Sequence, residues 1–233
     1  MGRQPVDVAY EHAELELRDG SKVSVRMFDS FYFGTGSKVW ASAKVLGRWL
    51  FNIRHELQGR RVLELGSGCG LGGLAAARWA SHVVLSDADA DLLKNLHWNV
   101  QAYEHSSRCE VRRLVWADAH QFEGPKPDIV IGSDLLYSNL AIPGLMHALE
   151  TFVGQGATVY LVLPCGSRHG LDPFLAALEQ SSISHVIRPA SRHLTRGLVV
   201  VDRERVESDE VLLLTLRPST TTKSTLGKRN RAV

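Results

Sequence analysis

The chain has 233 residues, of which 44% are hydrophobic and 22% are charged, and its formal net charge at pH 7 is +2. This length suits one large domain with small additions, and the composition excludes fibrous, membrane and wholly disordered classes. A net charge this small provides no strong field for nucleic acid or anionic lipid, so a nucleic-acid partner is disfavoured.

The cysteines and the chain's apolar segments indicate the cellular setting. Cys69, Cys109 and Cys165 form neither a CxxC pair nor a metal-ligand spacing with histidine, so we expect no metal and reduced thiols. The sequence has no apolar run of roughly 18 residues and no apolar signal core near its start, so we expect no membrane span. We therefore expect a cytoplasmic protein. Residues 228–231 (KRNR) offer a weak nuclear signal, with a solvated chain end as the alternative.

The first predicted elements are a hairpin and a helix. Residues 13–17 and 22–27 alternate apolar and polar side chains on either side of Asp19-Gly20, which indicates a β-hairpin. Residues 39–51 carry apolar side chains near helical spacing, and Ser37 is a candidate N-cap for that helix.

From Arg61 onward, predicted strands and helices alternate. Such alternation predicts a parallel sheet that is covered by helices on both faces. We expect strands near 61–65, 82–86, 111–116, 128–133 and 157–163, and helices near 71–80, 89–102, 140–152 and 171–181.

The last part of the chain changes character. Residues 184–188 and 211–216 indicate two further strands, which we interpret as an antiparallel pair, and residues 198–206 between them are ambiguous. From Pro218 onward the chain has almost no apolar residue and is predicted to be a disordered tail. We therefore expect an N-terminal extension over 1–36, one domain over 37–217 and a tail over 218–233.

A glycine-rich loop follows the first of the alternating strands. Gly66, Gly68 and Gly70 allow a ligand to approach the backbone closely, at the sheet edge where parallel strands end. The same loop also fits the spacing of a dinucleotide fingerprint, with glycines at 68, 70 and 73, so the glycines alone do not identify the ligand.

Two acidic residues favour S-adenosylmethionine over a dinucleotide. Glu64 precedes Gly66 by two residues, and a carboxylate there would repel a pyrophosphate but attract the ammonium group of a methionine. Asp87 ends the next strand and is expected to accept hydrogen bonds from both ribose hydroxyls. The alternatives are a Glu64 that caps a nearby loop and an Asp87 that caps the helix near Asp89.

Aromatic and acidic residues complete the expected nucleoside pocket. Trp116 and Asp118 follow the third strand, where we expect Trp116 to line the adenine pocket and Asp118 to accept from the adenine amine. Trp40 is expected to close over the ligand from outside the sheet. Packing in the core or between helices is the alternative for both tryptophans.

The fourth strand ends in Ser133-Asp134 and is followed by Tyr137. Methyl transfer needs an acceptor lone pair aimed at the methyl carbon, and enzymes supply much of this by orientation. We expect Asp134 to accept from and orient an incoming amine, and Tyr137 to present its ring to a partly cationic nitrogen. An ordinary strand-end Asp and a packed Tyr are the alternative.

Five segments together resemble the seven-β-strand lysine methyltransferases of the methyltransferase-like family. The resemblance implies cofactor contacts at Trp40, Gly66, Ser67, Gly68, Asp87, Trp116 and Ser133, and substrate-lysine contacts at Asp134 and Tyr137. It also implies a monomer, because such enzymes act on large partners. The segments are 39–43 (VWASA), 64–71 (ELGSGCGL), 86–87 (SD), 114–116 (LVW) and 132–137 (GSDLLY).

We therefore expect a Rossmann-like α/β fold with a seven-stranded methyltransferase sheet, mostly parallel with an antiparallel C-terminal strand, plus the N-terminal hairpin. The expected activity is S-adenosylmethionine-dependent methylation of a lysine on a protein substrate. The alternatives are the same fold acting on protein histidine or a small molecule, a non-catalytic module that binds the cofactor and a partner, and a nicotinamide-dependent oxidoreductase.

Overall fold

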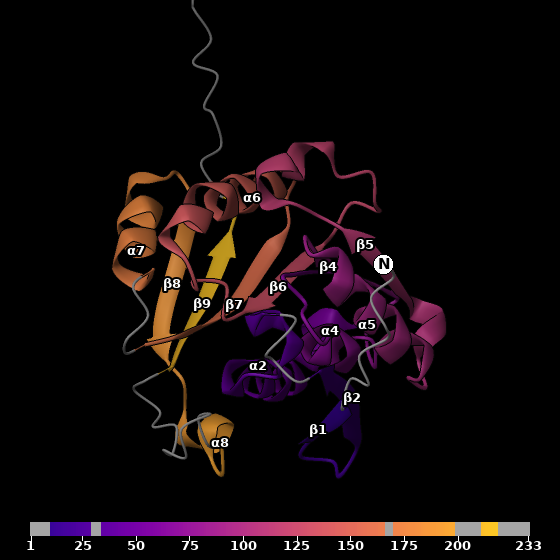
Figure 1. Ribbon diagram of the computed structural model, residues 1–233. Helices are drawn as coiled ribbons and strands as arrows, with labels where there is room; N and C mark the ends of the chain where they lie inside the picture. The colour runs from indigo at the N-terminus through magenta and orange to yellow at the C-terminus, as the bar shows by residue number, and fades with distance from the viewer. Residues whose placement is uncertain (1–9, 29–33, 166–169, 199–210, 219–233) are drawn as a thin grey trace, which may run out of the picture.

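The computed structural model describes residues 10–28, 34–165, 170–198 and 211–218 (Figure 1). Its first element is the predicted hairpin, formed by β1 (Tyr10–Glu16) and β2 (Lys22–Phe28) in antiparallel register. Gly20 has a φ of 80°, a left-handed value that favours glycine, and its N–H donates to the Leu17 carbonyl. The turn therefore depends on the Asp19-Gly20 pair that predicted it.

The hairpin forms a separate two-stranded sheet that packs against α5 (Ala90–Gln101). The side-chain amides of Asn95 and Asn99 both donate to the Arg26 carbonyl at 3.0 Å, and Asn99 Oδ1 accepts from the Arg26 N–H at 2.8 Å. These bonds join the extension to the main sheet's helices. The predicted boundaries at 36/37 and 217/218 stay predictions, and the predicted tail beyond Pro218 lies outside the described residues.

The second sheet has seven strands in the order β5-β4-β3-β6-β7-β9-β8. Every neighbouring pair is parallel except those of β9, which runs antiparallel to both β7 and β8. The predicted single antiparallel strand near the C-terminus is confirmed. The strands are β3 (Arg61–Leu65), β4 (His82–Asp87), β5 (Cys109–Arg113), β6 (Ile129–Ser133), β7 (Thr158–Pro164), β8 (Ser184–Pro189) and β9 (Val211–Arg217).

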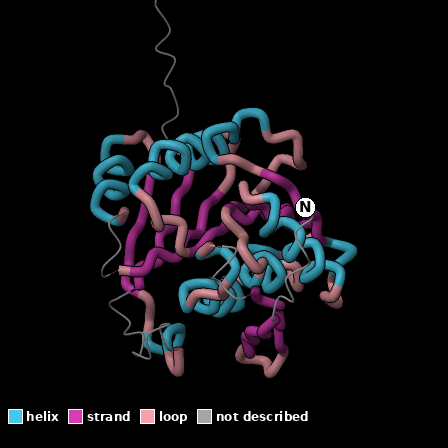
Figure 2. The backbone as a smooth tube through the Cα atoms, viewed as in Figure 1, coloured by secondary structure: helices cyan, strands magenta, loops and turns pink. Residues whose placement is uncertain are grey.

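Helices cover both faces of this sheet, as the alternating pattern predicted (Figures 1 and 2). Successive residues of β3 serve the two faces: Val62 packs into one hydrophobic cluster, and Leu63 and Leu65 pack into the other. One face carries α2 (Ala41–Asn52), α4 (Leu71–Ala76) and α5, and the other carries α6 (Ile142–Gly154) and α7 (Leu171–Gln180).

Short elements complete the described chain. They are the helices α3 (Arg54–Leu57) and α8 (Arg192–Thr195), and the 3₁₀ turns η1 (Thr35–Ser37), η2 (Ser106–Arg108), η3 (Trp116–Gln121) and η4 (Asn139–Ala141). None of the described helices is both long and apolar enough to cross a membrane.

Three local predictions need correction. The helix expected over 71–80 ends at Ala76, because the N–H groups of Arg78 and Trp79 bond three residues back in a tight turn. The strand expected over 111–116 runs from Cys109 to Arg113, and a 3₁₀ turn begins at Trp116. Ser37 does not cap α2. Its hydroxyl donates to the Gly34 carbonyl, and the N-cap position is Trp40. Most of the ambiguous segment 198–206 lies outside the described residues.

Candidate active site

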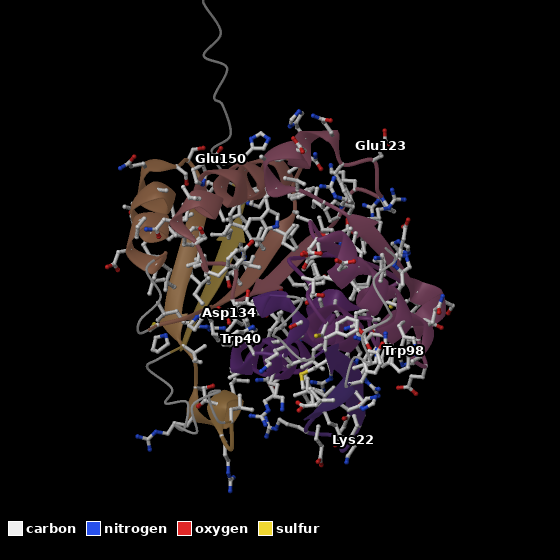
Figure 3. The ribbon with its side chains drawn as sticks, in the orientation of Figure 1. Lys22, Trp40, Trp98, Glu123, Asp134 and Glu150 are labelled. Atoms are coloured by element: carbon white, nitrogen blue, oxygen red, sulfur yellow. The ribbon has the colours of Figure 1, made fainter. Side chains whose placement is uncertain are left out.

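A cavity of about 690 Å³ opens where β3, β4 and β6 end. In a sheet of this type the carboxyl ends of the strands form the ligand-binding edge, and cavities of roughly 300–1,000 Å³ hold small organic ligands. Trp40 and Asp134, labelled in Figure 3, come from separate segments and both contribute to its lining. The predicted site residues that line it are Trp40, Gly66, Ser67, Gly68, Asp87, Trp116, Ser133, Asp134 and Tyr137.

The glycine loop forms the floor of the cavity between β3 and α4. Gly66, Gly68 and Gly70 all have left-handed backbones, with φ of 58°, 51° and 87°. Gly68 also has no room for a side chain, because a Cβ there would lie 2.7 Å from the Gly36 carbonyl oxygen. The loop needs glycine at position 68 for its conformation and for its close packing alike.

Ser67 joins the glycine loop to β4 through hydrogen bonds. Its N–H donates to the Ser86 carbonyl at 2.8 Å, and its hydroxyl accepts from the Ser86 N–H at 3.0 Å. The buried Ser86 hydroxyl in turn donates to the Glu64 carbonyl at 2.6 Å. These bonds fix the end of β4, and therefore Asp87, relative to the loop.

Asp87 lies at the point where loop and strand meet. One carboxylate oxygen accepts from the Gly68 N–H at 3.0 Å, and the other accepts from the Asp89 N–H at 3.2 Å. Burial raises the pKa of this carboxyl group, and the backbone hydrogen bonds oppose that rise. The N-cap of α5 is Asp89, which accepts from the N–H groups of Asp91 and Leu92, so Asp87 does not serve as that cap.

The segment 34–39, which we call the strap, crosses the glycine loop and forms the opposite wall. The buried Cys69 thiol donates to the Ser37 carbonyl at 3.2 Å, and burial raises its pKa to about 12, so it stays protonated. The indole N–H of Trp40 donates to the Thr35 carbonyl at 2.9 Å. These contacts hold the strap and Trp40 over the loop.

The remaining wall is formed by the residues that follow β5 and β6. The Trp116 and Tyr137 rings lie 6.1 Å apart between centroids, at an angle of 49°. Burial, with a smaller contribution from Asp87, raises the pKa of Tyr137, so its phenol stays protonated at neutral pH.

Asp134 has an unusual backbone at the end of β6. Among the described residues it is the one non-glycine with positive φ, at 57°, and its N–H donates to the Val162 carbonyl at 3.1 Å. Aspartate and asparagine tolerate this conformation better than most residues, and such outliers cluster at functional sites. The strand end therefore directs Asp134 out of the sheet's regular alternation and into the cavity lining.

The charged groups that line the cavity favour a cationic ligand. Among the described residues, three carboxylates contribute, from Asp87, Asp89 and Asp134, against one ammonium group, from Lys38. A sulfonium or ammonium group is attracted by this excess, whereas a diphosphate would be repelled. None of the described residues forms a group of three or more His, Cys, Asp or Glu side chains able to hold a metal ion.

Two predicted cofactor contacts lie elsewhere. The Glu64 side chain is buried beneath α4, where a Cβ on Gly73 would lie 2.7 Å from Glu64 Oε2, and it does not contribute to the cavity lining. Asp118 lines a separate cavity of about 270 Å³ with Arg112 and Arg113. Glu64 does not reach the cavity because its side chain turns beneath the first turn of α4, against Gly72 and Gly73. Asp118 misses it because the 3₁₀ turn after Trp116 carries it outward.

Sequence reasoning missed the strap and the start of α6. Thr35, Lys38 and Leu92 line the cavity, and Leu140 and Pro143 form part of its edge. The Gly34-Thr35-Gly36 sequence was a usable signal, because small residues permit the close approach to Gly68. No motif marks Leu140, whose position depends on the turn between β6 and α6.

The family model described as lysine methyltransferase matches residues 21–181, which is more than half of the chain. The chain belongs to the lysine methyltransferase family. The predicted family, and the prediction of an enzyme that methylates protein lysine, are confirmed.

Named relatives agree with this membership. The chain is 29% identical over 163 residues to EEF1A lysine methyltransferase 3 of Mus musculus, covering 68% of each chain. It is 32% identical over 152 residues to protein N-lysine methyltransferase METTL21A of Danio rerio, covering 63% of this chain and 68% of the relative. It is 35% identical over 178 residues to protein-lysine N-methyltransferase EEF2KMT of Homo sapiens, covering 68% of this chain but 54% of the relative.

Solved structures show the same fold. An O-methyltransferase from Bacillus cereus in complex with SAH gives a TM-score of 0.53 at 14% identity, covering 73% of this chain and 80% of that one. Cofactor-bound Rv0187 from MTB gives 0.54 at 16% identity, covering 82% and 94%. The predicted Rossmann-like methyltransferase sheet is therefore confirmed.

Proposed function

We propose that this lysine methyltransferase takes its methyl group from S-adenosylmethionine and that the cavity at the ends of β3, β4 and β6 holds this donor. The size of the cavity, its glycine floor and its excess of carboxylates support the proposal. When bound, the donor supplies an electrophilic methyl group on a sulfonium. The rest of the chemistry is binding and orientation by the protein's own residues.

The nucleoside end of the donor fits the groups near β4 and β5. The Asp87 carboxylate already accepts one backbone hydrogen bond at each oxygen, and its remaining lone pairs suit the two ribose hydroxyls. Trp116 offers an aromatic surface for the adenine. Trp40, held by Thr35, covers the donor from the strap side.

Asp134 and Tyr137 are the residues that we expect to contact the acceptor nitrogen. A lysine ammonium has a reference pKa of about 10.4 and must lose a proton before it attacks. Desolvation and a neighbouring sulfonium both lower that pKa, whereas the Asp134 carboxylate raises it, so the ammonium releases its proton to solvent before the neutral amine attacks the methyl carbon and displaces the sulfur. Asp134 then accepts a hydrogen bond from the amine and fixes its lone pair, and the Tyr137 ring forms a wall beside it.

The protein that carries the acceptor lysine is proposed to be met by a monomer of this chain in the cytoplasm, without nucleic acid. The names of the mouse and human relatives make elongation factors the first acceptors to test. The observation that carries the proposal is the meeting of Asp87, the glycine loop and Asp134 at one cavity in a chain of this family.

Calorimetry tests the donor directly. S-adenosylmethionine and adenosylhomocysteine are expected to bind, with one site per chain, and NAD is expected not to bind. Binding of NAD without binding of S-adenosylmethionine would reject the proposal, since the carboxylates of the cavity would then have to tolerate a diphosphate.

A further inference from the structure

One edge of the cavity carries three exposed side chains of largely apolar character at a spacing of three residues. Tyr137, Leu140 and Pro143 all line the cavity and are all exposed; we call them the apolar rim. Tyr137 keeps 57% of its surface accessible and Leu140 keeps 93%. Burial of a leucine side chain is favourable. A leucine that is almost fully exposed beside a reaction site can therefore pack against an apolar group of a partner.

The backbone fixes the apolar rim in place. Leu140 lies in η4, where the Ser138 hydroxyl accepts from the Leu140 N–H at 3.3 Å and the Ser138 carbonyl accepts from the Ala141 N–H at 3.1 Å. The next residue, Ile142, begins α6 with its side chain buried. A surface held between β6 and a packed helix needs little further ordering when a partner binds.

Other exposed large apolar side chains have different surroundings. Tyr10 and Trp98 both contact the Arg26 guanidinium, whose carbon lies 4.2 and 4.0 Å from their respective ring centroids. Val186 lies on β8, the edge strand of the sheet. The apolar rim differs from both because it is continuous with the cavity in which the lysine is proposed to react.

We infer that the apolar rim binds an apolar side chain located close to the target lysine in the acceptor protein. This inference rests on the proposed function. The lysine nitrogen meets Asp134, its aliphatic stem passes Tyr137, and the neighbouring apolar side chain contacts Leu140 and Pro143. The rim itself carries no formal charge, so it suits an apolar acceptor residue better than an acidic or basic one. Leu140 is therefore a specificity-determining residue.

The test measures acceptor use separately from donor binding. Wild type, Leu140→Glu, Leu140→Met and Val186→Glu are each incubated with tritiated S-adenosylmethionine and a native cell extract at a series of dilutions. Initial rates of protein labelling give the half-saturating extract concentration. Calorimetry gives the donor affinity, and light scattering gives the oligomeric state. Because Leu140 and Val186 are both exposed, none of these substitutions removes core packing.

Leu140→Glu is expected to raise the half-saturating extract concentration about tenfold, the loss typical of an interface anchor, with donor affinity within twofold of wild type. Leu140→Met keeps an apolar side chain and is expected to lose much less acceptor use than Leu140→Glu, whereas Val186→Glu is expected to match wild type. Unchanged acceptor use by Leu140→Glu overturns the inference. An equal loss of donor affinity overturns it too, since the rim would then serve the donor. Conversion of a dimer to a monomer would make the rim a self-association surface and also overturn it. If wild type labels no protein at all, the proposed function itself fails.

Discussion

The Asp87 carboxylate, at the end of β4, accepts a hydrogen bond from the backbone N–H of Gly68 at 3.0 Å. This bond joins the carboxylate at the end of β4 to the glycine loop that follows β3. The position of the carboxylate therefore depends on the left-handed backbone of Gly68, and the shape of the loop depends on the carboxylate. A ligand that contacts both is held by one connected unit.

Asp87→Asn is expected to weaken S-adenosylmethionine binding by about ten- to a hundredfold, because each lost charge-assisted hydrogen bond contributes roughly 1.5–3 kcal/mol. Calorimetry measures the change. Asp91→Asn is the matched control, since Asp91 is exposed on α5 and pairs with Lys94. Equal effects of the two substitutions would show that Asp87 has no special part in the cavity.

Donor affinity is also expected to fall in acid. The pKa of Asp87 is raised by burial, and a cationic donor with ribose hydroxyls favours the ionised carboxylate. Binding is therefore strong above that raised pKa and is lost as the pH falls through it. Calorimetry across the acidic range on wild type and Asp87→Asn measures this. A wild-type profile parallel to that of the Asn variant would contradict the assignment.

Asp134→Asn is expected to lower the methylation rate by at least about a hundredfold while donor affinity stays within a few-fold, because the amide is uncharged and misorients the amine. Asparagine is the informative substitution, because it tolerates the φ of 57° and so leaves the backbone in place. Asp134→Ala adds strain there and would confuse the two effects. Labelling kinetics at saturating donor provide the measurement, and a near-normal rate would remove Asp134 from the site.

Glu64 gives a stability prediction with a definite sign. Burial raises its pKa from 4.5 to about 7, so between these values the unfolded chain loses a proton that the folded chain keeps. The free energy of unfolding therefore falls as the pH rises through this window, by on the order of 3 kcal/mol, and levels off above it. Glu64→Gln has no ionisable group at this position. Its free energy of unfolding, relative to that of wild type, should therefore increase from pH 5 to pH 8.

Urea unfolding of both proteins at the two pH values tests this prediction. Carboxyl groups that do not interact with Glu64 contribute alike to both proteins and cancel in the difference, and the charge of Asp87 is the last-ranked cause of the raised Glu64 pKa. A constant difference between wild type and Glu64→Gln would mean that Glu64 is ionised in the folded protein throughout the range.

The packing around Glu64 gives a paired glycine test. A Cβ on Gly72 would collide with Glu64 Oε1 and lie 2.8 Å from Leu46 Cδ2, so Gly72→Ala should destabilise by about 1–3 kcal/mol. Gly154, the last residue of α6, has no atom within 4 Å of such a Cβ. Gly154→Ala should stabilise by about 0.5–1 kcal/mol. Thermal unfolding distinguishes the two, and equal shifts would contradict the packing.

Sequence reasoning located the parts of the site that follow directly from strand ends. Gly66, Asp87 and Asp134 come immediately after or at the end of buried strands, and parallel strands bring such ends to one edge of a sheet. Glu64 and Asp118 do not line this cavity, because the direction of a side chain at a strand end or in a 3₁₀ turn depends on backbone angles that no spacing reveals.

The carboxylates that favour a cationic donor are not all the ones expected from the sequence. The carboxylate expected from Glu64 is provided instead by Asp89 together with Asp87 and Asp134, which line the cavity that Glu64 does not reach. The small residues of the strap indicate a close backbone approach, but the sequence does not show that Gly68, far away in the chain, is the residue they approach. The position of Leu140 at the cavity edge could not be predicted from the sequence either, since its exposure there is a property of the folded chain.

The decisive measurement is mass spectrometry of a native cell extract incubated with S-adenosylmethionine that carries a deuterated methyl group. The prediction is deuterated methyl groups on lysine of at least one protein with the wild-type enzyme, above the label of the extract alone, and labelling that is at least about a hundredfold slower with Asp134→Asn. Label on histidine or on small metabolites alone, or lysine label that persists undiminished with Asp134→Asn, would contradict it.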